Sequence, residues 1–68
     1  MPKAKDLLRF LRRRGFIEKR QSGSHLVLQN PKTGYRAVLP MHPGDLPKGL
    51  FHRILKDAGL SLEDYQND

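Results

Sequence analysis

A histidine placed directly after a glycine turn is the residue of this chain best suited to chemistry. His25 follows Gln21-Ser22-Gly23-Ser24 and opens the apolar run Leu26-Val27-Leu28. The chain contains no cysteine, so there is no thiolate nucleophile and no disulfide. An imidazole has an unperturbed pKa of about 6.5 and exchanges protons near neutral pH. In a strongly basic protein this predicts proton transfer on a bound polyanion, and RNA is the polyanion that suits such chemistry.

RNA cleavage needs few protein groups, because the 2′-hydroxyl of the RNA is itself the nucleophile. The protein must supply a base for that proton, an acid for the leaving oxygen and cations for the crowded phosphorane. We predict that His25 is the general base or the general acid, and the sequence leaves both roles open. Gly23 permits close approach of the backbone to a phosphate, and the hydroxyls of Ser22 and Ser24 are candidates to bind phosphate oxygens.

Cations near His25 are candidates to stabilise charge on RNA. Lys19 and Arg20 lie across the predicted hairpin from His25, and Arg36 lies on the neighbouring predicted strand. Each also has a plainer interpretation as an exposed strand cation that discourages edge pairing. The prediction for these three residues therefore rests on proximity alone.

Two further segments carry candidate RNA-binding residues. His42 lies in a loop that could return beside the hairpin and supply a second proton-transfer group, or it is an ordinary loop histidine. Lys48, His52 and Lys56 are spaced four residues apart on one helix face, which could bind the RNA backbone or be a solvated face.

Metal and nucleotide cofactors are not predicted. The three histidines are spread over strand, loop and helix without recognised ligand spacing. The segment 44–49 lacks the Gly-Lys-Ser/Thr ending of a phosphate-binding loop. We therefore predict no metal site and no small-molecule cofactor.

The charge is unevenly distributed along the sequence. The net charge is +6, and residues 3–20 hold eight Lys and Arg against two acidic residues. Residues 57–68 carry four Asp and Glu with no Lys or Arg. This pattern predicts a dipolar domain that steers a polyanion to one side, although such charge also serves solubility.

The hydrophobic pattern predicts the elements that position His25. An amphipathic stripe from Ala4 to Leu11 predicts a helix that Gly15 ends. Residues 16–21, 25–29 and 35–40 predict three strands, and residues 50–58 mark a second helix, with Pro47 in its first turn.

The expected fold class is therefore α+β, with the order α-β-β-β-α. A three-stranded antiparallel sheet has two helices on one face, and its other face is open to solvent or a ligand. Because side chains alternate along a strand, His25 is exposed if Leu26 and Leu28 are buried. The predicted core consists of eleven residues: Leu7, Leu8, Leu11, Phe16, Leu26, Leu28, Leu39, Leu50, Phe51, Ile54 and Leu55.

The length of 68 residues predicts one small domain, residues 1–68, with one thin core. No signal peptide is evident and no apolar run approaches membrane-spanning length, so we expect no membrane association and a cytoplasmic location.

Four segments resemble the HicA-type mRNA interferase toxins of HicAB toxin–antitoxin systems. They are Arg14-Gly15-Phe16, Gly23-Ser24-His25, Val38-Leu39-Pro40-Met41-His42, and the stretch 49–60 followed by Ser61-Leu62-Glu63-Asp64-Tyr65. The likeness spans nearly the whole chain in the same order and spacing. Two positions depart from it: Leu50 stands where the family often has threonine, and His52 is not a position associated with the family.

The resemblance implies a fold like that of the double-stranded RNA-binding domain. It also implies a metal-independent endoribonuclease that cleaves mRNA and inhibits translation until a HicB-type antitoxin neutralises it. The essential histidine of the family falls on His25, which the antitoxin would be expected to cover while offering acidic groups to the basic surface.

An alternative from a different class is a non-catalytic module that binds double-stranded RNA by shape and 2′-hydroxyl contacts. The same fold and charge would serve both functions. The discriminating residue is His25, because a module that only binds RNA does not need it.

Overall fold

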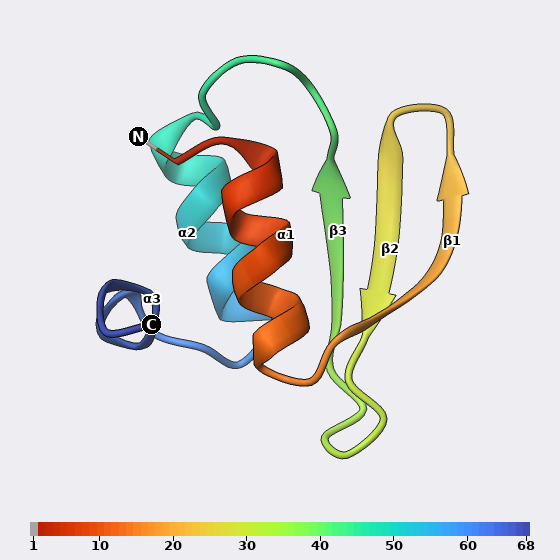
Figure 1. Cartoon of the computed structure of the whole chain (residues 1–68), viewed down its shortest axis with the longest axis vertical. Helices are drawn as coiled ribbons and strands as arrows, with labels where there is room; N and C mark the ends of the chain where they lie inside the picture. The colour runs from red at the N-terminus through yellow and green to blue at the C-terminus, as the bar shows by residue number, and fades with distance from the viewer. Residues whose placement is uncertain (1) are drawn as a thin grey trace.

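Two layers make up the fold, a three-stranded sheet and a layer of helices on one of its faces. The computed structural model describes residues 2–68. The elements are α1 (Ala4–Arg13), β1 (Ile17–Ser22), β2 (His25–Gln29), β3 (Arg36–Pro40), α2 (Lys48–Asp57) and α3 (Leu62–Gln66). Figure 1 shows α1 and α2 side by side on the same side of the sheet. The predicted α+β class and the order α-β-β-β-α are confirmed, and α3 follows as an unpredicted sixth element.

Helix α1 forms because its apolar residues repeat on one face. Its four buried residues are Ala4, Leu7, Phe10 and Leu11. At its start the backbone N–H of Lys3 donates a hydrogen bond to the Asp6 carboxylate, with an N–O distance of 3.1 Å. The helix ends before Gly15, whose φ of 94° lies in the left-handed region that favours glycine.

The sheet has the order β1-β2-β3, with all pairs antiparallel and β2 in the centre. Leu26 and Leu28 enter the core, as the alternation predicts. Val27 faces the opposite side, yet only 7% of it is exposed. Its cross-strand partners Arg20 and Val38 flank it on both sides, because β2 is the central strand.

The core lies between the sheet and the helices. Most of the predicted core is confirmed, but Leu8 and Leu50 are corrections, since both are only partly buried and pack at its margin. The buried core also includes residues that the predicted set lacks: Ala4, Phe10, Ala37, Leu46 and Ala58.

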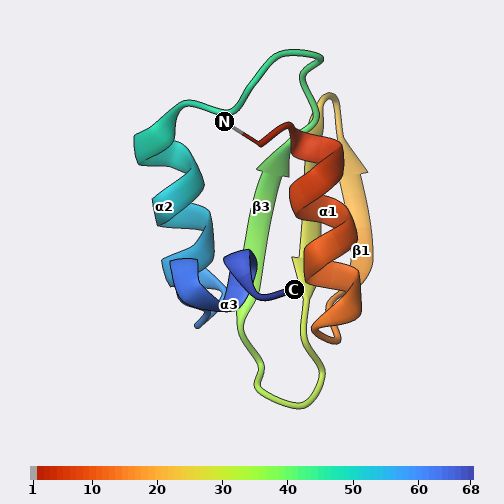
Figure 2. The ribbon, with the colours of Figure 1, turned by 60° about the vertical axis from the view of Figure 1, so that its left-hand side comes forward.

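Helix α3 packs across α1 and α2 through one aromatic residue. The Tyr65 ring meets the rings of Phe10 and Phe51 edge to face, each with centroids 5.0 Å apart. Figure 2 shows α3 crossing in front of the lower part of the molecule, between α2 and α1. Ser61 caps this helix, because its hydroxyl accepts the Asp64 N–H at 3.0 Å and its N–H donates to the Asp64 carboxylate at 2.9 Å.

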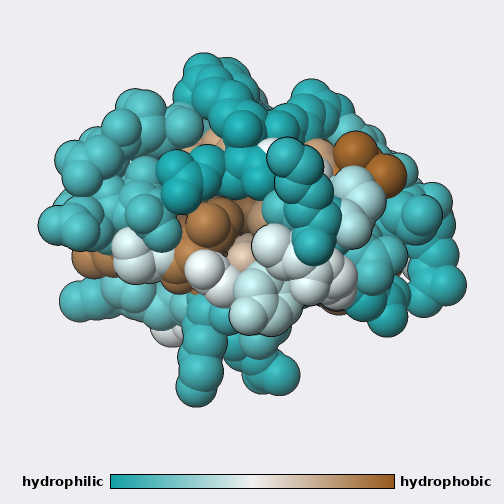
Figure 3. Space-filling view, turned by 90° about the horizontal axis from the view of Figure 1, so that it is seen from below, coloured by the Kyte–Doolittle hydropathy of each residue, from teal (hydrophilic) through white to brown (hydrophobic). Residues whose placement is uncertain are grey.

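Asn30 connects two segments at the end of the molecule below α1. Its side-chain amide donates to the carbonyl of Arg14 at 3.1 Å, and its side-chain oxygen accepts the Lys32 N–H at 2.9 Å. Only 8% of Asn30 is exposed. Seen from below, this end is mostly hydrophilic around a small apolar centre (Figure 3). The asparagine thus ties the β2–β3 loop to the end of α1.

The acidic C-terminal residues do not lie apart from the basic N-terminal stretch. Arg13 forms an ion pair with Asp68, and Arg14 forms one with Asp64 at 3.5 Å. The structure corrects the predicted separation of charge, because α3 returns the C-terminal acids to the basic end of α1. In the part of the chain described, no helix is long and apolar enough to cross a bilayer.

Candidate active site

His25 is the first residue of β2 and is exposed at the end of the strand that adjoins the β1–β2 turn. Its cross-strand partners are Ser22 and Pro40. The turn between β1 and β2 needs Gly23, whose φ is 58° and whose Cβ position is open space. Glycine is therefore favoured at this position by its backbone conformation and not by crowding.

The loop after β3 returns to the start of β2. The N–H of Met41 donates to the carbonyl of Ser24 at 2.6 Å, and the N–H of His42 donates to the carbonyl of Pro40 at 3.0 Å. Because Pro40 pairs with His25, these bonds hold His42 at the same end of the sheet. The loop thus returns beside the hairpin, which is the position in which His42 is a candidate for a second proton-transfer group.

His25 and His42 line one groove, here called the His25 groove. Its walls are β3, which contributes Val38 and Pro40, and α2, which contributes Leu50 and Ile54, together with Pro47, Arg53 and Asp57. Its volume is about 510 Å³. The groove thus combines two exposed imidazoles with apolar walls and one guanidinium.

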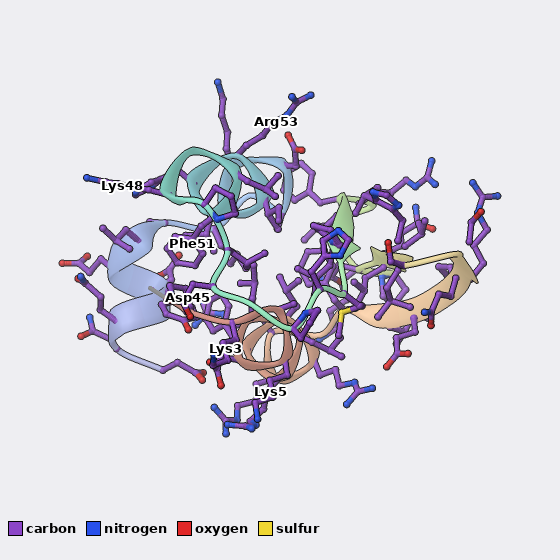
Figure 4. All side chains as sticks on the ribbon, turned by 90° about the horizontal axis from the view of Figure 1, so that it is seen from above. Lys3, Lys5, Asp45, Lys48, Phe51 and Arg53 are labelled. Atoms are coloured by element: carbon purple, nitrogen blue, oxygen red, sulfur yellow. The ribbon has the colours of Figure 1, made fainter. Side chains whose placement is uncertain are left out.

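Arg53 is the groove residue that the sequence analysis missed. Its side chain projects outward from α2, as Figure 4 shows, and lies 4.0 Å from the Asp57 carboxylate. Residues 50, 53, 54 and 57 share one side of a helix, because they are spaced three and four residues apart. That spacing was available in the sequence, but nothing local indicated that this side would face His25.

Lys19, Arg20 and Arg36 gather in a different place. They line a shallow hollow on the outer face of the sheet with Val27 and Gln29, and His25 does not line it. The residue directly across from His25 is Ser22, and the register shifts between Glu18 and Arg20, which displaces Lys19. The three cations share the sheet surface with His25 but form a separate cluster.

The predicted stripe on α2 is also away from His25. Lys48 and His52 line a pocket with Phe51 and with Leu62 and Tyr65 of α3. Lys56 is exposed and lines neither this pocket nor the His25 groove. Helix α3, which the sequence did not predict, lies beside this side of α2. The predicted stripe therefore lies near a boundary between two helices.

The remaining candidates lie in the turn. Ser22 is exposed beside His25, whereas Ser24 is partly buried and uses its carbonyl to hold Met41. Within residues 2–68, no group of three or more His, Asp or Glu side chains lies close enough to hold a metal ion. The chemistry that this arrangement offers is proton transfer and charge stabilisation on a ligand in the groove.

The chain was compared with models of known protein families. A family model described as the HicA toxin of bacterial toxin–antitoxin matches residues 4–60, from the start of α1 to just beyond α2. The matched region contains His25, His42 and Arg53. No curated protein matches the chain.

Proposed function

This chain belongs to the HicA toxin family of bacterial toxin–antitoxin systems, and from that premise we propose that it is an endoribonuclease that cleaves mRNA. Cleavage of mRNA inhibits translation, which is how such an activity makes the protein a toxin. The substrate places the reaction in the cytoplasm.

One observation carries the proposal: His25 is exposed in a groove that also contains His42 and Arg53. A phosphodiester held there would have two imidazoles and a guanidinium within one small surface. Asp57 faces Arg53 and restrains it without full burial, since both side chains are more than half exposed. The guanidinium therefore stays accessible to a phosphate.

The reaction we propose is an internal displacement. One imidazole removes the proton of the 2′-hydroxyl, the O2′–P bond forms, and the P–O5′ bond breaks. The other imidazole donates a proton to the leaving O5′, which gives a 2′,3′-cyclic phosphate and a free 5′-hydroxyl. Arg53 stabilises the charge of the phosphorane. His25 and His42 share these two proton-transfer roles, and a metal ion is not needed because the nucleophile belongs to the RNA.

Membership of the family implies an antitoxin partner. We propose that this partner is of the HicB type and that it neutralises the toxin by covering the His25 groove. Acidic side chains on such a partner would complement Arg53 and the cations of the sheet face.

The test is cleavage of a labelled single-stranded RNA in excess chelator by wild type and His25→Ala. We expect the variant to lose about 10²–10⁴-fold in rate, because a proton-transfer group contributes that much. His52→Ala is the matched control, since His52 is exposed but lies beside α3 instead of in the groove. Circular dichroism checks that all three proteins are folded, and mass spectrometry identifies the product ends.

Three results would count against the proposal. Equal cleavage by wild type and His25→Ala would remove His25 from the reaction. Cleavage that disappears in chelator would make the reaction metal-dependent. Binding of RNA without cleavage by the wild type would favour the non-catalytic RNA-binding module instead.

A further inference from the structure

A second hollow lies on the other side of His42 from the His25 groove. It is lined by Lys3, Ala4, Lys5, Met41, His42 and Pro43, and is here called the Lys5 hollow. His42 is the one residue that lines both depressions among those described. A ligand that leaves the His25 groove over His42 therefore enters the Lys5 hollow directly.

The hollow lies between the start of α1 and the loop after β3. Figure 4 shows Lys3 and Lys5 at the α1 side of this loop and Arg53 on α2, across the molecule from the two lysines. The loop is held at both ends, since Met41 N–H bonds to Ser24 and the N–H of Leu46 donates to the Pro2 carbonyl at 2.9 Å. The hollow is thus preformed by backbone hydrogen bonds.

The chemistry of the lining suits a nucleotide. Met41 and Pro43 offer an apolar wall for a base or ribose, and the lysines at the rim offer ammonium groups for a phosphate. The hollow has a volume of about 490 Å³.

The two lysines differ in their existing partners. Lys3 lies 3.5 Å from the Asp45 carboxylate, and both side chains are more than half exposed. Such an exposed pair contributes little, so a phosphate can compete for the ammonium group. Lys5 has no ion-pair partner within residues 2–68. Its charge is therefore available to a ligand.

We propose that the Lys5 hollow binds a nucleotide that neighbours the scissile phosphate, on the same single strand of RNA. The proposal rests on the proposed function, because it takes the His25 groove as the place of cleavage. It extends that function by giving the substrate a path across the surface: one unpaired strand runs from the groove of β3 and α2, over His42, to the start of α1.

The experiment separates binding from cleavage. Affinity is measured by fluorescence anisotropy with an RNA oligonucleotide made uncleavable by 2′-O-methyl groups, and cleavage is measured with the unmodified oligonucleotide. The variant is Lys5→Ala, which suits an exposed helical position and leaves the Lys3–Asp45 pair intact. The matched control is Lys32→Ala, an exposed lysine in the β2–β3 loop at the opposite end of the molecule.

We expect Lys5→Ala to weaken RNA binding about three- to tenfold and to reduce the slope of log affinity against log salt by about 1, because one phosphate contact is lost. KM should rise while kcat is retained, and Lys32→Ala should match wild type. A dinucleotide that fills only the groove should be cleaved equally by wild type and Lys5→Ala.

Unchanged affinity and an unchanged salt slope in Lys5→Ala would overturn the inference, even where the wild type cleaves RNA. An equal loss in Lys32→Ala would also overturn it, since the effect would then be one of net charge. If the wild type binds RNA without cleaving it, the proposed function fails. In that case the loss of binding or of salt slope in Lys5→Ala still decides whether the hollow contacts RNA.

Discussion

The two ends of α1 carry similar cations and use them differently. At its C-terminal end, Arg12, Arg13 and Arg14 are paired with Glu18, Asp68 and Asp64 respectively. At its N-terminal end, Lys5 is unpaired among the described residues, and the neighbouring hollow and groove hold two exposed histidines. The basic stretch looks uniform in sequence, but its arginines form ion pairs within the fold whereas Lys5 is left at the surface.

This difference shows why positive charge alone is a poor guide to an RNA-binding surface. The arginine run Arg12–Arg14 is the densest basic segment of the chain, yet each of its side chains forms an ion pair, with Glu18 of β1, with Asp68 beyond α3 and with Asp64 of α3 respectively. Among the described residues, cations without an ion-pair partner lie elsewhere and include Lys5 and the cluster of Lys19, Arg20 and Arg36. We therefore expect substitutions at the His42 end to change activity and substitutions at the α3 end to change stability.

Among the substitutions that compare the two ends, His42→Ala should have the largest effect, and it tests the activity side of the comparison. If His25 and His42 share proton transfer, cleavage should fall about 10²–10³-fold with an unchanged unfolding midpoint. A variant that is as active as wild type would leave His25 as the only histidine in the reaction.

The second effect is on stability at the other end. Tyr65→Ala removes the two edge-to-face contacts that hold α3 on Phe10 and Phe51, and should lower the free energy of unfolding by about 2–3 kcal/mol, since the ring is only partly buried. Urea unfolding measures this, and Tyr65→Phe serves as a control that keeps both ring contacts. The cleavage rate per folded molecule should stay the same. A large loss of rate would mean that the packing of α3 also affects the reaction in the His25 groove.

The smallest effect concerns Asp64 and acid. Hydrogen bonds from Ser61 lower the pKa of the Asp64 carboxyl from its ordinary value of 3.8, and Arg14 adds to this while desolvation opposes it. A carboxyl with a lowered pKa in the folded state stabilises the fold above its unfolded pKa, and that contribution is lost as pH falls through the folded pKa.

Asp64→Asn should therefore be less stable than wild type at neutral pH, and the difference should shrink below about pH 4. Urea midpoints measured from about pH 2 to about pH 7 give the comparison. A difference that is independent of pH would mean that the charge of Asp64 contributes nothing and that the side chain acts only as a cap.

Much of the fold was predictable because its signals are local. The strand alternation at Leu26 and Leu28 exposed His25, and Gly15 and Gly59 marked the ends of the two long helices. Helix α3 was not predictable in this way, because five residues give too little periodicity and its stability comes from Tyr65 and the Ser61 cap.

The candidate site was predictable only in part. His25 followed from its turn, and His42 was a candidate with two interpretations. The sequence predicts Lys19 and Arg20 across the hairpin from His25, whereas the structure pairs His25 with Ser22. A two-residue turn and a bulge decide that register, and neither the length of the turn nor the position of the bulge can be predicted from residue types alone.

By itself the sequence determined what depends on covalent geometry and neighbouring residues: the alternation that exposes His25, the helix stripes, the turn at Gly23 and the excess of positive charge. Only the tertiary structure decided which of those charges meet. Met41 bonds to Ser24, and Asp64 and Asp68 reach Arg14 and Arg13, across long stretches of chain. Such contacts depend on how helices and loops pack on the sheet, so the grouping of His25 with His42 and Arg53 is a property of the fold.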